Sequence, residues 1–349
     1  MTSSSRKVLV TGGAGFIASH VADAYLARGD EVWVVDDLST GRRENVPSRA
    51  TFVEMDVRNG AIRDLFREVR FDVVNHHAAQ IDVRVSVADP RFDAEVNLLG
   101  LLNVLEGARE VGTGRFVFVS SGGVVYGEPE TRPTPETAPK LPLSPYGVTK
   151  LTGELYLNYY RHVHGLQYVA LRYGNVFGPR QDPHGEAGVV AIFSDRLLDH
   201  EPLTIFGDGE QTRDYVFVGD VVSANMVVSD MDLEGLEEEA GRSAHPDRAA
   251  FGNAGEAGTG GGGRPEGIDA VAFNVGTGRG TSVNALADVL EGVSGRRPGR
   301  RHEAARPGEL RHSALDTTRL RARGWSREWS LEDGLRDTFD YIANERETT

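Results

Sequence analysis

A glycine-rich turn between a short apolar stretch and a helical pattern constrains the fold of this chain more than any other feature. The turn lies in the sequence TGGAGFIASH at 11–20, after a predicted strand at 7–10 and before a predicted helix from Phe16 to about Arg28. Gly12 permits a tight turn, and Gly15 lets backbone N–H groups approach a pyrophosphate at the helix N-terminus. Because a strand precedes the turn and a helix follows it, the pattern predicts a dinucleotide-binding loop.

The next predicted strand, residues 31–35, ends in two carboxylates, Asp36 and Asp37. A carboxylate in this position accepts hydrogen bonds from the adenosine ribose hydroxyls and repels a 2′-phosphate. A capped turn is the alternative interpretation, because Asp is common after strands. With the glycine loop upstream, the sequence favours NAD binding, and NAD over NADP. The Lys-Ser/Thr pair of a phosphate loop is absent, which argues against an ATPase.

Strands and helical patterns alternate through the first half of the chain. Further strands are predicted at 51–53, 71–75 and 115–119. This alternation predicts an α/β fold with a doubly wound parallel sheet of the Rossmann type. Ligands of such sheets lie beyond the carboxyl ends of the strands. Asp56 and the segment Ala78-Ala79-Gln80 are therefore expected on the same rim as the glycine turn.

Composition excludes several classes of function. The 349 residues, enough for one or two domains, include no cysteine, which removes disulfides, thiolate metal ligands and cysteine nucleophiles. His76 and His77 are adjacent in a strand, so they point to opposite faces, and we interpret them as structural, with no metal site. The formal net charge of −14 argues against nucleic acid or an anionic membrane as a partner. Without an eighteen-residue apolar run or a signal-peptide core, a cytoplasmic protein is expected.

Tyr146 and Lys150, in the sequence SPYGVTK at 144–150, are the candidate catalytic pair. Residues four apart share one face of a helix, and a helical, apolar pattern continues from Leu151 to Tyr160. A fixed cation within about 4–6 Å favours the phenolate, which is a general base near neutral pH. Lys occurs only at positions 7, 140 and 150, whereas Arg is abundant. A surface helix carrying one Tyr and one Lys is the alternative.

Together these motifs resemble the extended short-chain dehydrogenase/reductase family, in particular its NAD-dependent nucleotide-sugar 4-epimerases. The matches follow the family's order over almost the whole chain. They are TGGAGFIASH at 11–20, DDLSTG at 36–41, DV at 56–57, HHAAQIDVRVSVADP at 76–90, VN at 96–97, SSGGVVYG at 120–127, SPYGVTK at 144–150, RYGNVFGPRQDP at 172–183, FGDGEQTRDYVFV at 206–218 and RPGE at 306–309.

The resemblance implies two domains with the site in the cleft between them. An NAD-binding Rossmann domain is expected at 1–175, with returning segments near 210–230 and 270–278, and a smaller α/β domain for a UDP-sugar at 176–209 and 279–349. The expected cofactor contacts are Gly12, Gly15, Phe16, Ile17, Asp36, Asp37, Ser39, Thr40, Gly41, Asp56, Val57, His77, Ala78, Ala79, Gln80, Asn97, Tyr146, Lys150 and Tyr173.

The resemblance also implies a set of substrate contacts. Arg213 and Arg306 are expected to clamp the diphosphate, because Arg binds phosphate in a bidentate manner. For Arg84, a sugar carboxylate and a phosphate both remain open as partners. The full set is Arg84, Ser121, Tyr146, Asn175, Val189, Val190, Ile205, Phe206, Arg213, Arg306 and Glu309.

The loop SSGGVVYG at 120–127 indicates the type of reaction. Related sugar 4,6-dehydratases carry Thr-Asp-Glu where this chain has Gly122, Gly123 and Val124, and UDP-glucuronate decarboxylases usually carry a carboxylate there. None of the three residues in this chain transfers a proton, which disfavours both reactions. Many 4-epimerases place a catalytic Ser or Thr at the position of Gly122. The hydroxyl is then expected from Ser121 or Ser120, with Ser121 favoured; the alternative is that both serines only bond backbone at a strand end.

The expected activity is a UDP-hexose 4-epimerase that acts on UDP-glucose and UDP-galactose. The resemblance implies that Tyr146 removes the 4-hydroxyl proton, a hydride leaves C4 for NAD, and hydride returns to the opposite face of a 4-keto sugar. UDP-glucuronate 4-epimerisation is the near alternative. A dehydratase or decarboxylase, or a non-catalytic NAD-binding protein, is the more distant one.

Two further expectations concern the rest of the chain. Residues 232–269 contain few large apolar side chains and are expected to form a flexible insertion with no chemistry. A helix is expected on either side of it, at about 220–229 and 282–290, with a strand at 272–275. The resemblance also implies a homodimer that pairs two helices of each subunit, about 97–110 and 146–164.

Overall fold

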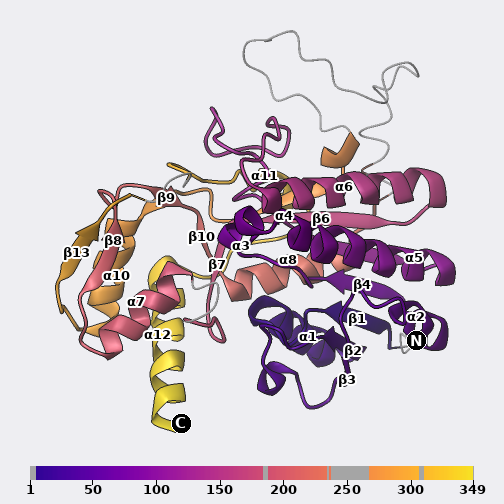
Figure 1. Ribbon diagram of the computed structural model, residues 1–349, viewed down its shortest axis with the longest axis horizontal. Helices are drawn as coiled ribbons and strands as arrows, with labels where there is room; N and C mark the ends of the chain where they lie inside the picture. Colours follow the sequence, from indigo (N-terminus) through magenta and orange to yellow (C-terminus); the bar gives the residue numbers. More distant parts are fainter. Residues whose placement is uncertain (1–4, 184–187, 234–235, 237–266, 306–309, 349) are drawn as a thin grey trace.

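A seven-stranded parallel sheet forms the centre of the protein (Figure 1). The computed structural model describes residues 5–183, 188–233, 236, 267–305 and 310–348. The strand order reverses between β1 and β4, so the carboxyl ends of these strands form the switch point at which doubly wound sheets bind ligands. This confirms the predicted fold class. The strands in order across the sheet are β11 (Ala272–Val275), β6 (Tyr168–Tyr173), β5 (Arg115–Ser121), β4 (Val73–His76), β1 (Lys7–Thr11), β2 (Glu31–Asp36) and β3 (Thr51–Glu54).

Helices cover both faces of the sheet. α1 (Phe16–Arg28) and α8 (Val218–Asp230) pack together on one face, whereas α2 (Ile62–Val69), α5 (Leu101–Val111) and α6 (Pro145–His164) lie on the other. The direction of the connections explains this division. The step from β1 to β2 through α1 and the return from β3 to β4 through α2 run in opposite directions, and right-handed crossovers place their helices on opposite faces.

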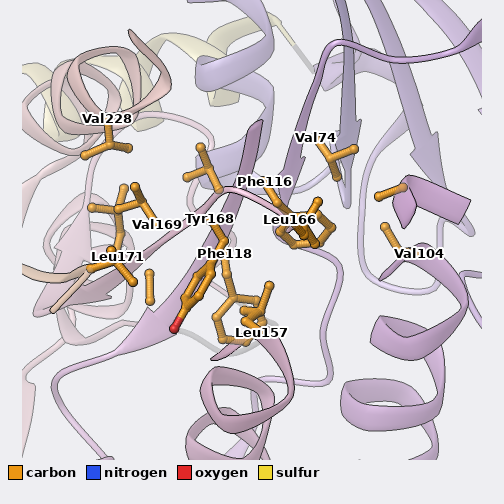
Figure 2. Packing of buried hydrophobic residues seen from close by; sticks show 14 of the residues in the cluster. Val74, Val104, Phe116, Phe118, Leu157, Leu166, Tyr168, Val169, Leu171 and Val228 are labelled. Atoms are coloured by element: carbon orange, nitrogen blue, oxygen red, sulfur yellow. The ribbon is translucent and has the colours of Figure 1, made fainter. Parts of the chain in front are cut away.

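The main apolar core fills the space on both sides of β5 and β6. Figure 2 shows Val169 and Leu171 on the side of Val228 from α8, and Tyr168 on the side of Leu157 from α6. Successive strand residues alternate between faces, and both faces here are covered. For this reason β6 reads as YVALRY, apolar except for Arg172.

A second apolar core lies beyond the carboxyl ends of the sheet. Phe177, Phe193, Leu286 and Leu335 are among its buried residues, and Phe16 at the start of α1 packs against it. The first turn of α1 therefore lies between the sheet and this second core. The elements of this region are β7 (Asn175–Phe177), α7 (Val189–Leu198), β8 (Leu203–Phe206), β9 (Thr212–Arg213), β10 (Tyr215–Phe217), β12 (Thr281–Ser282), α10 (Val283–Ser294), β13 (Arg300–Glu303) and α12 (Leu331–Thr348).

Short elements complete the described chain. They are η1 (Arg43–Asn45), α3 (Val83–Ala88), α4 (Pro90–Ala94), a π-helix η2 (Glu95–Gly100), η3 (Gly267–Asp269) and α11 (Thr318–Arg321). Among the described residues, no helix is both long enough and apolar enough to cross a membrane.

The predicted elements agree with the structure to within a few residues at their ends. The strand expected at 272–275 and the helices expected near 220–229 and 282–290 are β11, α8 and α10. Most of the expected insertion, residues 237–266, lies outside the described residues. At its two ends, Leu233 and Leu236 are buried in the main core and Asp269 forms ion pairs, so packed structure extends further into this segment than predicted.

Candidate active site

Tyr146 and Lys150 lie on one face of α6, as their spacing predicts. The helix begins there because Ser144 is its N-cap, accepting a hydrogen bond from the Gly147 N–H at 3.1 Å, and Pro145 takes the first helical position. The Lys150 side chain is buried, and its Nζ donates to the Val119 carbonyl at 3.0 Å. This ammonium lies 5.7 Å from the centroid of the Tyr146 ring. A buried cation is therefore held beside the phenol.

Ser121 and Asn175 approach the same point from two strand ends. A Cβ added to Gly123 would lie 3.7 Å from Ser121 Oγ and 4.0 Å from Asn175 Oδ1, so the two polar groups flank this glycine. Ser121 ends β5, the strand whose Val119 carbonyl holds Lys150, while Asn175 begins β7. The Ser121 side chain thus stands at the rim, at the carboxyl end of β5.

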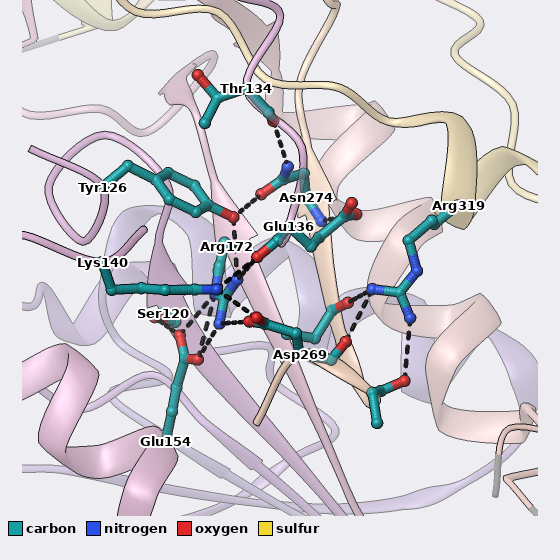
Figure 3. Close-up of polar contacts among 12 residues, drawn as sticks. Ser120, Tyr126, Thr134, Glu136, Lys140, Glu154, Arg172, Asp269, Asn274 and Arg319 are labelled. Atoms are coloured by element: carbon teal, nitrogen blue, oxygen red, sulfur yellow. Dashed lines mark hydrogen bonds and ion pairs between the residues drawn. The ribbon is translucent and has the colours of Figure 1, made fainter. Parts of the chain in front are cut away.

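Ser120 faces the opposite side of β5 and has a different partner. Its Oγ donates to Glu154 Oε1 at 2.5 Å, and Figure 3 shows this contact among buried polar residues. Neighbouring residues of a strand point to opposite faces, so only one of two consecutive serines is able to face the cleft. The side chain of Ser120 is 2 % exposed, which leaves it out of reach of a substrate.

Gly122 lies where the packing leaves little room for a side chain. A Cβ at this position would lie 2.6 Å from Leu315 Cδ1 and 3.3 Å from the Arg172 carbonyl oxygen. Leu315 is buried beside Val125 and Tyr126, the continuation of the same loop. The space beside Gly122 is filled by Leu315, so a side chain at this position would require Leu315 to move.

The N-terminus of α1 fits the pyrophosphate of a dinucleotide. Its N-cap residue, Gly15, makes no side-chain capping bond, and the first turn contains no acidic residue, so the helix N-terminus attracts an anion. Gly12 has a φ of +69°, and a Cβ there would lie 2.8 Å from the Ala78 nitrogen. The glycine turn and the predicted segment His77–Gln80 are therefore in contact, as a shared cofactor rim requires.

Asp36 and Asp37 have separate environments at the end of β2. Both Asp36 oxygens accept backbone N–H bonds, from Ala14 at 3.0 Å and from Leu38 at 2.8 Å. Burial raises the pKa of Asp36, and the two backbone bonds act against that rise. Asp37 is exposed and accepts from Ser39. Asp36 therefore ties the glycine loop to β2, which was not foreseen, while both carboxylates stay at the predicted rim.

Three other predicted cofactor residues mainly bond the protein. The Asn97 amide accepts from the Gln80 N–H and donates to the Gln80 carbonyl, both at 2.9 Å, and so supports that segment. The Tyr173 hydroxyl accepts from Asn225 at 2.6 Å, and its ring lies beside His77. Asp56 pairs with the exposed Arg58, whose hydrogen bonds lower the pKa of Asp56.

His76 and His77 are held neutral inside the protein. Burial lowers the pKa of each to about 3, with a smaller contribution from the nearby Lys150 charge. His76 bonds Thr11 at 2.8 Å, in agreement with its interpretation as structural. The Nε2 atom of His77 is buried and has no hydrogen-bond partner within the described protein. Such an atom at the rim is suited to a hydrogen bond with a bound cofactor.

Six predicted substrate residues, including Asn175 at the start of β7, lie in the region of the second apolar core. Val189 and Val190 open α7, Ile205 and Phe206 end β8, and Arg213 is half-buried in β9. Arg306 and Glu309 lie outside the described residues. Just beyond them, Arg311 forms a bidentate pair with Asp208 at 2.7 and 2.8 Å. Arg84 is exposed and pairs with Asp82, the N-cap of α3, so this partner is within its own turn.

Two buried charged residues behind the site were missed. Arg172 is fully buried and donates to both oxygens of Glu154, at 3.0 and 2.5 Å, and to Asp269 at 2.8 Å (Figure 3). Asp214, also fully buried, accepts from Thr277, Gly278 and Leu315. A charged residue inside an apolar strand, as in YVALRY, is a sequence signal for such a pair, because buried charges are almost always paired.

Comparison with known proteins agrees with this geometry. The model of the NAD dependent epimerase/dehydratase family matches residues 8–240. The chain is 42% identical over 344 residues to a UDP-glucose 4-epimerase of Mycolicibacterium smegmatis, covering 97% of this chain and 99% of the relative. The chain is also 39% identical over 344 residues to a putative UDP-glucose 4-epimerase of Methanocaldococcus jannaschii, covering 98% of this chain and 100% of the relative.

Solved structures give the same result. A UDP-glucose 4-epimerase of Thermotoga maritima with UDP-glucose superposes with a TM-score of 0.85 at 41% identity, covering 97% of this chain and 99% of the other. The Thermus thermophilus UDP-glucose 4-epimerase in complex with NAD has a TM-score of 0.83 at 42% identity, with the same coverage. The chain belongs to the NAD-dependent epimerase/dehydratase family.

Proposed function

We propose that this protein is an NAD-dependent UDP-hexose 4-epimerase that inverts C4 of UDP-glucose and UDP-galactose. The observation that carries the proposal is the placement of Tyr146, Lys150 and Ser121 at one rim, in a chain similar to UDP-glucose 4-epimerases along its whole length. The alternative reactions need an acid or base in the loop after β5. Gly122, Gly123 and Val124 supply none, which disfavours a dehydratase or a decarboxylase.

The cofactor is NAD, held by the glycine turn and the start of α1. Gly12 and Gly15 admit the pyrophosphate, Asp36 and Asp37 meet the adenosine ribose, and His77 offers a buried nitrogen that no described residue bonds. When bound, NAD accepts a hydride from the sugar and gives it back. The rest of the chemistry belongs to the side chains of this chain.

Tyr146 takes the proton of the sugar 4-hydroxyl and later returns it. The buried Lys150 ammonium stabilises negative charge on the phenol oxygen, and its bond to the Val119 carbonyl fixes it in that place. Ser121 donates a hydrogen bond to the sugar O4 while charge develops there. Arg213, with Arg306 and Glu309, holds the nucleotide while the sugar turns over between the two hydride transfers.

Separate alanine substitutions of the two serines should distinguish their roles. Ser121→Ala removes a donor to developing charge and is expected to lower kcat by about 10²-fold. Ser120→Ala removes a hydrogen bond to Glu154, which keeps its bonds from Arg172, so kcat should fall less than about tenfold. Initial rates with UDP-galactose measure both. A larger loss for Ser120→Ala would reverse the assignment.

The sugar specificity is tested by a direct conversion assay. Purified protein is incubated separately with UDP-glucose and UDP-glucuronate, and proton NMR follows the configuration at C4. Conversion of UDP-glucose to UDP-galactose is expected. Conversion of UDP-glucuronate alone would assign the protein to the alternative epimerase, and conversion of neither sugar, with NAD supplied, would contradict the proposed function.

The partner that we propose for the exposed face of α6 is a second copy of this chain. Val148, Leu155, Tyr159 and Val163 form an apolar stripe on that helix, each between 49% and 59% exposed. Two such stripes would bury one another, because they are apolar and lie on a rigid helix. Light scattering during gel filtration should give a dimer mass. Leu155→Asp together with Tyr159→Asp should give the monomer mass, and an unchanged mass would exclude this face.

A further inference from the structure

The first five residues of the loop between β7 and α7, residues 178–182, lie against the beginning of α1. Arg180 Nη1 forms an ion pair with Asp23 at 2.8 Å and donates to Ser19 Oγ at 3.1 Å. His20 Nε2 lies 2.9 Å from the Pro179 carbonyl oxygen, to which it donates when that nitrogen carries the proton. These three α1 residues lie on the first two turns of the helix, next to the turn assigned to the pyrophosphate.

The same loop is also linked to the glycine turn through Arg42. Asp182 Oδ1 forms an ion pair with Arg42 Nη2 at 3.4 Å, and the backbone N–H of Arg42 donates to the Ala14 carbonyl at 2.9 Å. On its other side the loop lies against α7, where a Cβ on Gly188 would meet Gln181 at 2.3 Å. Residues 178–182 therefore connect the cofactor end of α1 with the helix that begins at Val189, on the substrate side.

The backbone of Arg180 indicates that these contacts hold the loop in place. Arg180 has a φ of +68°, a left-handed conformation that Arg adopts infrequently. Such a conformation persists where surrounding contacts fix it, and it is often associated with function. The loop also lies close to the first residue of α8, because a Cβ on Gly178 would lie 2.4 Å from Val218 Cγ1.

We propose that Arg180 and His20 are positioning residues that fasten this loop over the start of α1 and so keep NAD in the site. The proposal rests on the proposed function, in which one resident cofactor serves both hydride transfers. A cofactor that left between them would strand the oxidised sugar. Release of NAD then requires the loop to separate from α1, breaking the contacts of Arg180 with Asp23 and Ser19.

The chain supplies a matched control at the other end of α1. Arg28 is 26% exposed and pairs with Asp30 and Asp230, whereas Arg180 is 25% exposed and pairs with Asp23. Arg28→Ala and Arg180→Ala therefore each remove a partly exposed arginine that forms ion pairs at α1, two in the case of Arg28 and one in the case of Arg180. Of these two arginines, only Arg180 belongs to the loop at the cofactor end.

The test measures exchange of resident NAD without turnover. Holoprotein is mixed with excess isotopically labelled NAD, and samples freed of unbound nucleotide are analysed by mass spectrometry over time. Arg180→Ala should speed exchange about tenfold, the effect expected for an ion pair and a hydrogen bond, and Arg28→Ala less than twofold. The Arg180–Asp23 ion pair is partly exposed, so salt screens it, and NAD exchange from the unmodified protein should be faster at 1 M salt. Arg180→Ala lacks this ion pair, so its exchange rate should no longer depend on salt in this way.

A charge swap provides the rescue. Asp23→Arg alone should speed exchange at least as much as Arg180→Ala, and Asp23→Arg with Arg180→Asp should return it toward the original rate. Asp is tolerated in the left-handed conformation at 180 better than most residues. Unchanged exchange in Arg180→Ala, or equal acceleration in Arg28→Ala, would overturn the proposal. UDP-glucose conversion by the same preparations, with NAD in excess, tests the proposed function separately.

Discussion

Replacing Tyr146 with phenylalanine should lower kcat by about 10²–10⁴-fold, the range that general acid–base groups contribute. The substitution removes one oxygen and leaves the ring beside Lys150, whose ammonium is 5.7 Å from the ring centroid. The fold and the bound NAD should be unaffected, because α6 keeps its cap at Ser144 and Lys150 keeps its bond to Val119. Initial rates of UDP-galactose conversion, with NAD content determined on the same sample, measure the effect.

Tyr156 of the same helix is the matched control. It is 37% exposed, so Tyr156→Phe removes the same atom from a side chain that does not face Lys150. Its kcat should stay within a factor of two of the unmodified protein. If Tyr146→Phe kept more than half of the original kcat, proton transfer by Tyr146 would have to be abandoned.

Replacing Glu154 with glutamine should destabilise the protein by about 3 kcal/mol, the lower end of the cost of breaking a buried ion pair from one side. Burial alone lowers the pKa of Arg172, but Glu154, Tyr126 and Asp269 together more than offset that effect and hold the pKa above its usual value. Without this carboxylate, Arg172 retains Asp269 as its one acidic partner among the residues described. The free energy of unfolding in urea, at one fixed NAD concentration, gives the loss.

Glu110→Gln is the control for this effect. Glu110 pairs with Arg63 and Arg67, whose side chains are 37% and 53% exposed, so the pair is partly in solvent. Pairs of this kind contribute about 0.2–1 kcal/mol. A loss for Glu154→Gln no larger than that for Glu110→Gln would show that the buried network adds little to stability.

The fold was predictable because each local sequence pattern predicts a strand, turn or helix that the doubly wound sheet contains. The strand at 7–10, the glycine turn and the helix from Phe16 each have their own sequence signal, and the structure places β1 and α1 there. Alternation of strands and helices then leaves a doubly wound parallel sheet as the expected arrangement. The pairing of Tyr146 with Lys150 was equally accessible, because a spacing of four residues fixes one helical face.

Side-chain orientation at the end of β5 was not predictable to the same degree. Ser120 and Ser121 differ in the face of β5 from which their side chains project, and the sequence does not show which of the two faces the rim. The Glu154–Ser120 bond joins residues 34 positions apart, and the Asp214–Leu315 bond joins residues 101 apart. Contacts over such separations carry no periodic signal. The hydrogen bond between Asp36 and the glycine loop was not predicted either, because it depends on how closely β2 approaches α1 in the folded protein.

Transfer of deuterium placed on C4 of UDP-glucose tests the central claim most directly. Purified protein with its resident NAD is incubated with this substrate in ordinary water, and mass spectrometry and NMR locate the label in UDP-galactose. A hydride that leaves C4 and returns to C4 within one closed site keeps its deuterium, so retention at C4 is the expected result. Loss of the label to water would show that C4 is inverted by proton exchange, and would contradict hydride transfer to a resident NAD.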